Sequence, residues 1–153
     1  MEAPRCTCHL VLNDKNVPTG DIAFVKGTPF DFCQGKKISQ DMPSSGYDNY
    51  FVASDQDTLN GPVLPLLTIT APAGEHGPAV TMEVISNQPG FQMYTANGFS
   101  GDGAGSFEKH GSIAIEPSGY IDATNHVNFP TATLNPHETR KQVITYHFTT
   151  LST

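Results

Sequence analysis

The stretch Ala79-Val-Thr-Met-Glu-Val-Ile-Ser86 carries a clear strand signal, and Asn87-Gln-Pro-Gly-Phe-Gln-Met-Tyr-Thr95 follows it directly. Alternation of side-chain character over 79–86 predicts a half-buried β-strand. Pro89-Gly90 breaks the pattern, because Pro lacks a backbone donor and Gly favours turns. A second strand resumes from Phe91 to Thr95. The stretch therefore predicts two short strands and no helix.

Working outward, further short apolar or aromatic runs predict strands in both directions along the chain. They cover residues 9–12, 22–25, 47–53, 64–70, 111–116 and 143–149. Polar or Gly-rich loops separate them, including 54–62 and 96–106, and the 12 Pro and 14 Gly leave little room for long helices. We expect an all-β protein, an antiparallel β-sandwich of about seven to nine short strands. It should form a single domain over residues 1–153, with 1–9 as a loose end.

The charge balance excludes several classes of partner. The formal net charge is −7, and the eight Lys and Arg residues never form a run. A phosphate backbone needs a positive stripe, so nucleic acid is not an expected partner.

No apolar stretch has transmembrane length, and the first five residues lack the apolar core of a secretory signal. Three sparse cysteines do not make a disulfide framework. We therefore expect a cytoplasmic protein that does not contact membranes.

Glu116 is a candidate catalytic residue. Ile113 and Ile115 share one face of the predicted strand 111–116, and Ser112, Ala114 and Glu116 share the other. This pattern predicts a carboxylate at a strand end, facing a loop-lined rim. Partial burial there would suit it to proton abstraction. The alternative is a solvated glutamate at a strand end, which is the commoner situation.

Asp48 is a candidate ligand-binding residue, because it lies between Tyr47 and Tyr50. A carboxylate beside aromatic rings can hold a sugar: the carboxylate accepts hydroxyl hydrogen bonds, and a ring stacks on the C–H face. The alternative is a turn aspartate that bonds its own backbone.

Metal and nucleophile chemistry find little support. None of the six histidines pairs with another at the helical spacing of a zinc protease motif. Cys6, Cys8 and His9 are potential zinc ligands, but no second cluster follows at zinc-ribbon spacing. No Gly-x-Ser-x-Gly motif is present. We expect no metal site and no cofactor.

Several segments, in order, resemble the aldose 1-epimerase (galactose mutarotase) family. They are Val17-Pro-Thr-Gly-Asp-Ile22 with Gly27-Thr-Pro-Phe-Asp-Phe32, then Tyr47-Asp-Asn-Tyr-Phe-Val52, then 87–95, and finally Lys109-His110 through Glu116 to Asp122-Ala-Thr-Asn125 and Phe129-Pro130. A single short match would be weak, but collinear matches from residue 17 to 136 are specific. The resemblance is to the C-terminal part of the family.

The resemblance implies both a fold and an activity. The fold would be part of a large antiparallel β-sandwich, the supersandwich of galactose mutarotase, to which both halves of the chain contribute strands. Glu116 would be the general base that takes the proton from the anomeric hydroxyl of an aldohexose such as galactose or glucose. Asp48 and Gln92 would hold sugar hydroxyls, and no cofactor is implied.

The sequence also departs from the family pattern. The family's acid histidine, a second histidine and an arginine lie before the Pro-Thr-Gly segment, and His9 is too late to be either histidine. Asn49 stands where a histidine is usual, Ser118 where a glutamine is usual, and His137 where a turn glycine is usual. We therefore expect weak or no epimerase activity from this chain alone.

Two other functions remain open: a non-catalytic sugar-binding or regulatory remnant, and a structural fragment. A partial sandwich would expose sheet edges and apolar faces. Such a chain could pair with itself, pair with a missing half, or rearrange.

Overall fold

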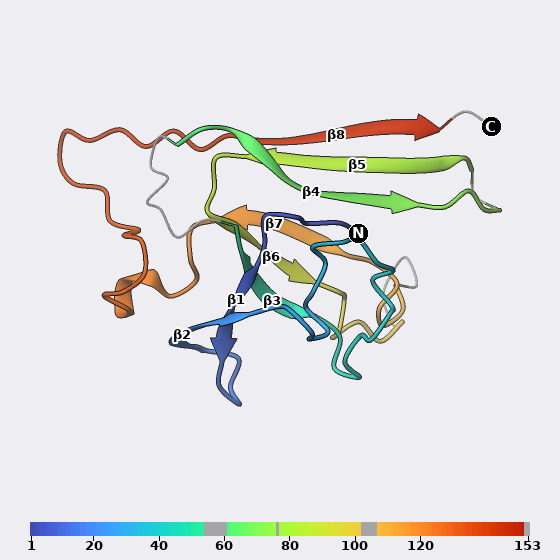
Figure 1. Cartoon of the computed structure of the whole chain (residues 1–153), viewed down its shortest axis with the longest axis horizontal. Helices are drawn as coiled ribbons and strands as arrows, with labels where there is room; N and C mark the ends of the chain where they lie inside the picture. Colours follow the sequence, from blue (N-terminus) through green and yellow to red (C-terminus); the bar gives the residue numbers. More distant parts are fainter. Residues whose placement is uncertain (54–60, 76, 102–106, 152–153) are drawn as a thin grey trace.

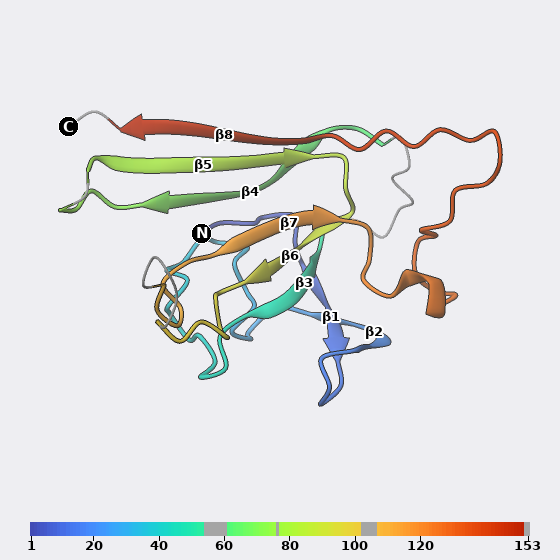
Figure 2. The same cartoon turned by 180° about the vertical axis from the view of Figure 1, so that it is seen from behind.

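The computed structural model describes residues 1–53, 61–75, 77–101 and 107–151, and shows two antiparallel sheets in two layers (Figures 1 and 2). A five-stranded sheet has the order β2-β1-β3-β6-β7, and a three-stranded sheet has the order β4-β5-β8. The strands are β1 Cys8–Leu12, β2 Pro18–Phe24, β3 Asp48–Val52, β4 Leu64–Ala71, β5 Ala79–Ser86, β6 Gly90–Tyr94, β7 Ala114–Ser118 and β8 Ile144–Leu151. The predicted all-β antiparallel architecture is confirmed. Residues 54–60 and 102–106 of the predicted loops lie outside the described residues.

The strand bounds differ from the predicted ones at functionally important places. β7 begins at Ala114 rather than Gly111, because Gly111 closes a turn in which its N–H donates to the carbonyl of Glu108 (2.9 Å). β7 then continues through Pro117, which an edge strand tolerates because a missing N–H there interrupts no ladder. Glu116 therefore lies in the middle of its strand and not at its end.

Two features of the loops also bear on the predictions. Among the described residues the helical structure is a single 3-10 turn, η1 (Ala123–Asn125). No helix in the described ranges has the length and apolar character needed to cross a membrane. His137, expected to replace a turn glycine, has φ 72°. This left-handed conformation is one that glycine adopts without steric cost, which explains why a glycine would suit the position.

The N-terminus is packed, contrary to the expected loose end. The Met1 ammonium donates to the carbonyl oxygen of Lys36 (2.8 Å). Glu2 forms an antiparallel bridge with Thr68 of β4. Ala3 and Cys6 are fully buried in the core. The packing of this segment could not be predicted from the sequence, because the segment has no periodic pattern. Isolated apolar residues hold it against the core.

The main core lies between the two sheets. Phe51, Phe91 and Met93 of the five-stranded sheet are fully buried, and the rings of Phe51 and Phe91 stack at 5.3 Å. Leu67 and Val84 meet them from the three-stranded sheet. A second cluster covers part of the opposite face of the five-stranded sheet, and it joins Leu10, Tyr50, Val52, Tyr120 and Phe129. The five-stranded sheet is thus packed on both faces.

Gly90 allows the side chain of Tyr50 to cross β6. The register aligns Val52 of β3 with Gly90, and Gly90 with Ser118 of β7. The Tyr50 hydroxyl donates to the carbonyl oxygen of Ser118 (2.7 Å), and a Cβ on Gly90 would lie 2.8 Å from that hydroxyl and collide with the Phe51 carbonyl oxygen. Tyr50 is fully buried, and burial raises its pKa well above the ordinary value. The Pro-Gly break in the sequence therefore marks a close approach of three strands.

Replacing Gly90 with Ala should lower the free energy of unfolding by about 1–3 kcal/mol, because the added methyl must displace Tyr50 or the β3 backbone. Urea unfolding followed by circular dichroism measures this change. Gly74→Ala is the matched control, because a Cβ there meets nothing within 4 Å. A Gly90→Ala protein as stable as the parent chain would contradict the close approach.

Candidate functional site

Asp48, Gln92 and Glu116 lie on one face of the five-stranded sheet. Gln92 of β6 is the register partner of Tyr50 on β3 and of Glu116 on β7. Asp48 lies two residues before Tyr50, so it shares the face of Tyr50. Register partners also share a face. The three candidates therefore come from three neighbouring strands and point away from the core between the sheets.

Asp48 and Gln92 are in direct contact. The Gln92 amide nitrogen Nε2 donates to Asp48 Oδ1 at 2.6 Å, across 44 residues of sequence. The orientation of the amide follows from this contact, because an ionised carboxylate only accepts hydrogen bonds. The Asp48 carboxylate thus engages a neighbouring strand, unlike a turn aspartate that bonds its own backbone.

The other end of the Gln92 amide carries an unused acceptor. Its oxygen Oε1 is buried and has no hydrogen-bond partner among the described residues. A buried acceptor without a partner costs about 1–3 kcal/mol. A hydroxyl group from a ligand would relieve that cost. This atom is therefore the point of the site that most clearly calls for a hydrogen-bond donor.

Glu116 lies at the centre of β7 with its side chain exposed, so the expected partial burial is wrong. Cross-strand partners have Cβ atoms about 4.5–5.5 Å apart, which places the carboxylate beside Gln92. A shallow surface therefore carries two carboxylates and one amide.

Side chains from the other layer hold the outer edge of β7 on both sides of Glu116. The Tyr146 hydroxyl of β8 donates to the carbonyl oxygen of Ile115 (2.9 Å). The Gln142 amide donates to the carbonyl oxygen of Pro117 (3.4 Å). Burial and then the charge of Glu116 raise the pKa of Tyr146. Sequence reasoning missed both residues, because nothing local links 142 or 146 to residue 116.

Three histidines lie away from this site. The His9 ring packs on Phe30 (centroids 4.4 Å apart), and burial lowers its pKa. His110 lies beside Gly46 and Thr95, next to the start of β3 and the end of β6, where its Nδ1 is 3.0 Å from the carbonyl oxygen of Thr95. His126 contacts Gly20 of β2, the opposite edge of the sheet from β7. Each of these three rings thus has its own contacts among the described residues, and none of those contacts involves Glu116.

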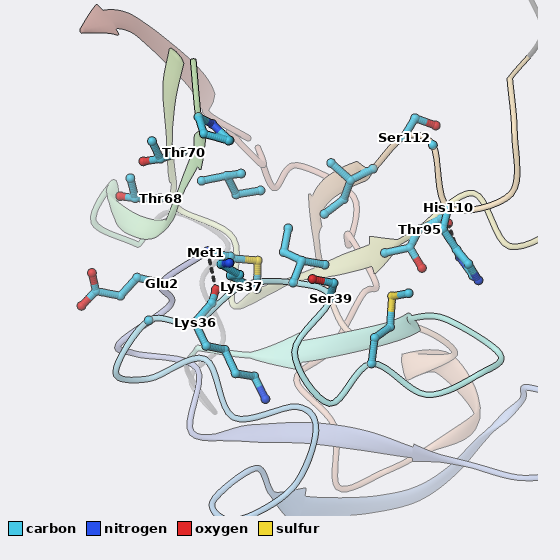
Figure 3. A pocket seen from close by; sticks show the side chains of 17 residues that line it. Met1, Glu2, Lys36, Lys37, Ser39, Thr68, Thr70, Thr95, His110 and Ser112 are labelled. Carbon is cyan, nitrogen blue, oxygen red and sulfur yellow. Dashed lines mark hydrogen bonds between the residues drawn. The ribbon is translucent and has the colours of Figure 1, made fainter. Parts of the chain in front are cut away.

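Two cavities in the described part of the chain lie away from the three candidate residues. One measures about 920 Å³ and opens between the layers, beside the N-terminus and β4 (Figure 3). Ile69 and Ile113 form part of its apolar wall, and Lys37, Ser39 and His110 lie around it. A smaller cavity of about 410 Å³ lies near Asp31 and Asp41. None of the three candidate residues lines either of these two cavities.

The described residues contain no group of three or more His, Cys, Asp or Glu side chains that could hold a metal ion. One carboxylate can accept a proton, and an adjoining carboxylate–amide pair can hold a polyhydroxylated ligand.

Comparison with known proteins gives one consistent result. The family model described as aldose 1-epimerase matches residues 8–147. Galactose mutarotase of Bos taurus is 31% identical over 138 residues, which cover 84% of this chain and 37% of the bovine protein. Maltose epimerase of Levilactobacillus brevis is 26% identical over 148 residues, which cover 92% of this chain and 40% of that protein.

The fold has a similar counterpart among solved structures. An aldose epimerase homologue from C. elegans superposes with a TM-score of 0.79 at 22% identity, over 99% of this chain and 45% of that chain. The chain thus spans less than half the length of these relatives. Because the family model matches most of the sequence and the sheets follow the same fold, the chain belongs to the aldose 1-epimerase family.

Proposed function

We propose that this chain binds an aldohexose such as galactose or glucose and contributes the general base of anomer interconversion. The observation that carries the proposal is the placement of Asp48, Gln92 and Glu116 on adjacent strands of one face. The names of the relatives, galactose mutarotase and maltose epimerase, support a sugar with a free anomeric hydroxyl as the ligand.

In this proposal, Asp48 and Gln92 hold the sugar and Glu116 acts on it. A carboxylate oxygen accepts more than one hydrogen bond, so Asp48 can receive a sugar hydroxyl while it keeps its bond from Gln92. The Oε1 of Gln92 is covered in this structure, and it accepts a second hydroxyl once a small side-chain movement exposes it. The sugar then lies over β6, next to the Glu116 carboxylate.

The chemical step is a ring opening that Glu116 starts. Its carboxylate takes the proton of the hydroxyl on C1, and the bond between C1 and the ring oxygen breaks as the C1 carbonyl forms. The electron pair of that bond goes to the ring oxygen, which takes up a proton. Rotation about the C1–C2 bond turns the aldehyde over, and the reverse proton transfers close the ring as the other anomer.

Protonation of the ring oxygen is the step for which we identify no side-chain acid among the described residues. His9, His110 and His126 lie away from Glu116. In this proposal water acts as the acid. A positioned acid or base typically contributes about 10²–10⁴-fold to a rate, so catalysis by this chain alone should be weak.

A non-catalytic sugar-binding role is the second candidate, and the exposure of Glu116 favours it. A base open to water is not tuned for proton abstraction unless the sugar itself covers it. The Asp48–Gln92 contact does not depend on how well Glu116 can abstract a proton. Binding could therefore persist where turnover is lost.

A polarimetric assay with α-galactose separates the two candidates. The chain should interconvert anomers at least about a hundredfold more slowly than bovine galactose mutarotase assayed alongside it. Glu116→Gln should remove any rate above that of buffer. Glu83→Gln, on the other sheet, is the control that should change nothing. Turnover at the bovine rate would show that the chain already contains an efficient acid.

Calorimetric titration with galactose tests the binding part. Asp48→Ala should weaken binding by about tenfold or more, since a hydrogen bond to a charged group contributes about 1.5–3 kcal/mol. Glu116→Gln should bind nearly as well as the parent chain. Asp21→Asn on β2 serves as the matched control. Equal affinity of the Asp48→Ala variant and the parent would place the sugar elsewhere.

A further inference from the structure

We propose that two copies of this chain pair through their β8 strands, in antiparallel orientation, to form one continuous six-stranded sheet. The proposal concerns the outer edge of the β4-β5-β8 sheet, far from the Asp48–Gln92 contact. It does not depend on the proposed sugar chemistry.

β8 is an unusually uncovered strand. Every side chain from Ile144 to Thr150 is exposed, on both faces of the strand. Tyr146 and Phe148 are the register partners of Val84 and Met82, so they share the face that turns towards the core. Val84 is fully buried, yet Tyr146 is 44% and Phe148 62% exposed. The core-facing side of the three-stranded sheet is thus covered at Val84 on β5 but exposed at Tyr146 and Phe148 on β8.

β8 is also the outermost strand of its layer in both views (Figures 1 and 2). Its pairing with β5 runs from Ser86–Ile144 to Ala79–Leu151 without a register shift. No proline interrupts it, and no described residue pairs with its other edge. A long, regular, uncharged edge is the kind that recruits another strand.

Each of the other three sheet edges is interrupted at one or two residues by a local contact. On β7, Pro117 lacks an N–H, and Tyr146 and Gln142 cap the carbonyls of Ile115 and Pro117. On β4, Glu2 exchanges backbone hydrogen bonds with Thr68 (2.8 and 2.9 Å).

On β2, the fourth edge, Asn128 donates to the carbonyl oxygen of Gly20 (2.8 Å). Of the edges that the structure describes, β8 therefore offers the best template for a new strand.

The chemistry of β8 favours a second copy as that strand. The sequence Ile-Thr-Tyr-His-Phe-Thr-Thr-Leu contains no Asp, Glu, Lys or Arg, so two copies bring no like charges together despite the net charge of −7 per chain. A basic partner attracted by that net charge would find no carboxylate on this strand. β-branched and aromatic residues, which dominate β8, pair well across strands.

Two-fold symmetry brings the exposed apolar side chains together. With the two-fold axis perpendicular to the sheet, each face of one copy continues into the same face of the other, so even-numbered positions lie opposite even-numbered positions. Ile144, Tyr146 and Phe148 of both copies then line one side of the joined sheet. An isologous contact of this kind closes on itself and gives a dimer rather than a fibre.

Sedimentation equilibrium on the whole chain, from about 2 to 200 µM, tests the pairing. We expect a species of twice the 16.4 kDa chain mass whose fraction grows with concentration. Phe148→Lys should raise the dimer dissociation constant at least about tenfold, because it removes apolar contact and opposes like charges. The matched control is Phe24→Lys, which charges a 78% exposed aromatic position on β2 and should leave dimerisation unchanged.

Hydrogen–deuterium exchange on the unmodified chain provides a second readout that needs no folded variant. Amides of 144–151 that point away from β5 should exchange quickly when dilute and slow down as the dimer forms, while those of β2 stay constant. A chain that remains monomeric throughout would overturn the proposal. So would a dimer that Phe24→Lys weakens as much as Phe148→Lys, or association without protection of β8.

Discussion

The hydrogen bond from Tyr50 to the carbonyl oxygen of Ser118 ties together the three strands that carry the candidate site. It spans β6, so β3 and β7 are held in fixed register on either side of Gln92. Gly90 makes the crossing possible, and Tyr120 and Phe129 shield it from water. Asp48 and Glu116 keep their positions relative to Gln92 because this tie prevents β3 and β7 from sliding. Gly90 therefore contributes to the relative positions of Asp48, Gln92 and Glu116, because it makes room for the Tyr50 side chain.

The site and the open interior lie on opposite faces of β7. Ile115 faces the core, while Glu116 faces outward. The cavity near Ile113 and the bare face of β8 are the places where the layers fail to cover one another. The face of β7 that carries Glu116 and the face that borders the core are therefore separate surfaces.

Residue pattern alone predicted much of this architecture. Alternation over Ala79–Ser86 and the aromatic run at Tyr47–Ala53 located strands to within a residue or two, because period-two burial is a local property. The assignment of Ile115 and Glu116 to opposite faces is confirmed for the same reason. Long-range contacts were beyond reach: the packing of Ala3, the capping of Ile115 by Tyr146 and the exposure of Glu116 depend on which strands meet in space. The strand start at Ala114 was missed because Gly111 forms a turn that its apolar neighbours conceal.

The Asp48–Gln92 contact has a consequence for ligand selectivity. Because the carboxylate orients the amide before any ligand arrives, the buried Oε1 is a rigid acceptor at one point on the surface. Under the proposed sugar binding, an acceptor fixed at one point would distinguish stereoisomers, because it pairs with the epimer whose hydroxyl points towards it and leaves the other epimer unpaired. A deoxy analogue that lacks the hydroxyl leaves the atom unpaired, and sites of this type reject such analogues far more strongly than apolar pockets reject a missing methylene.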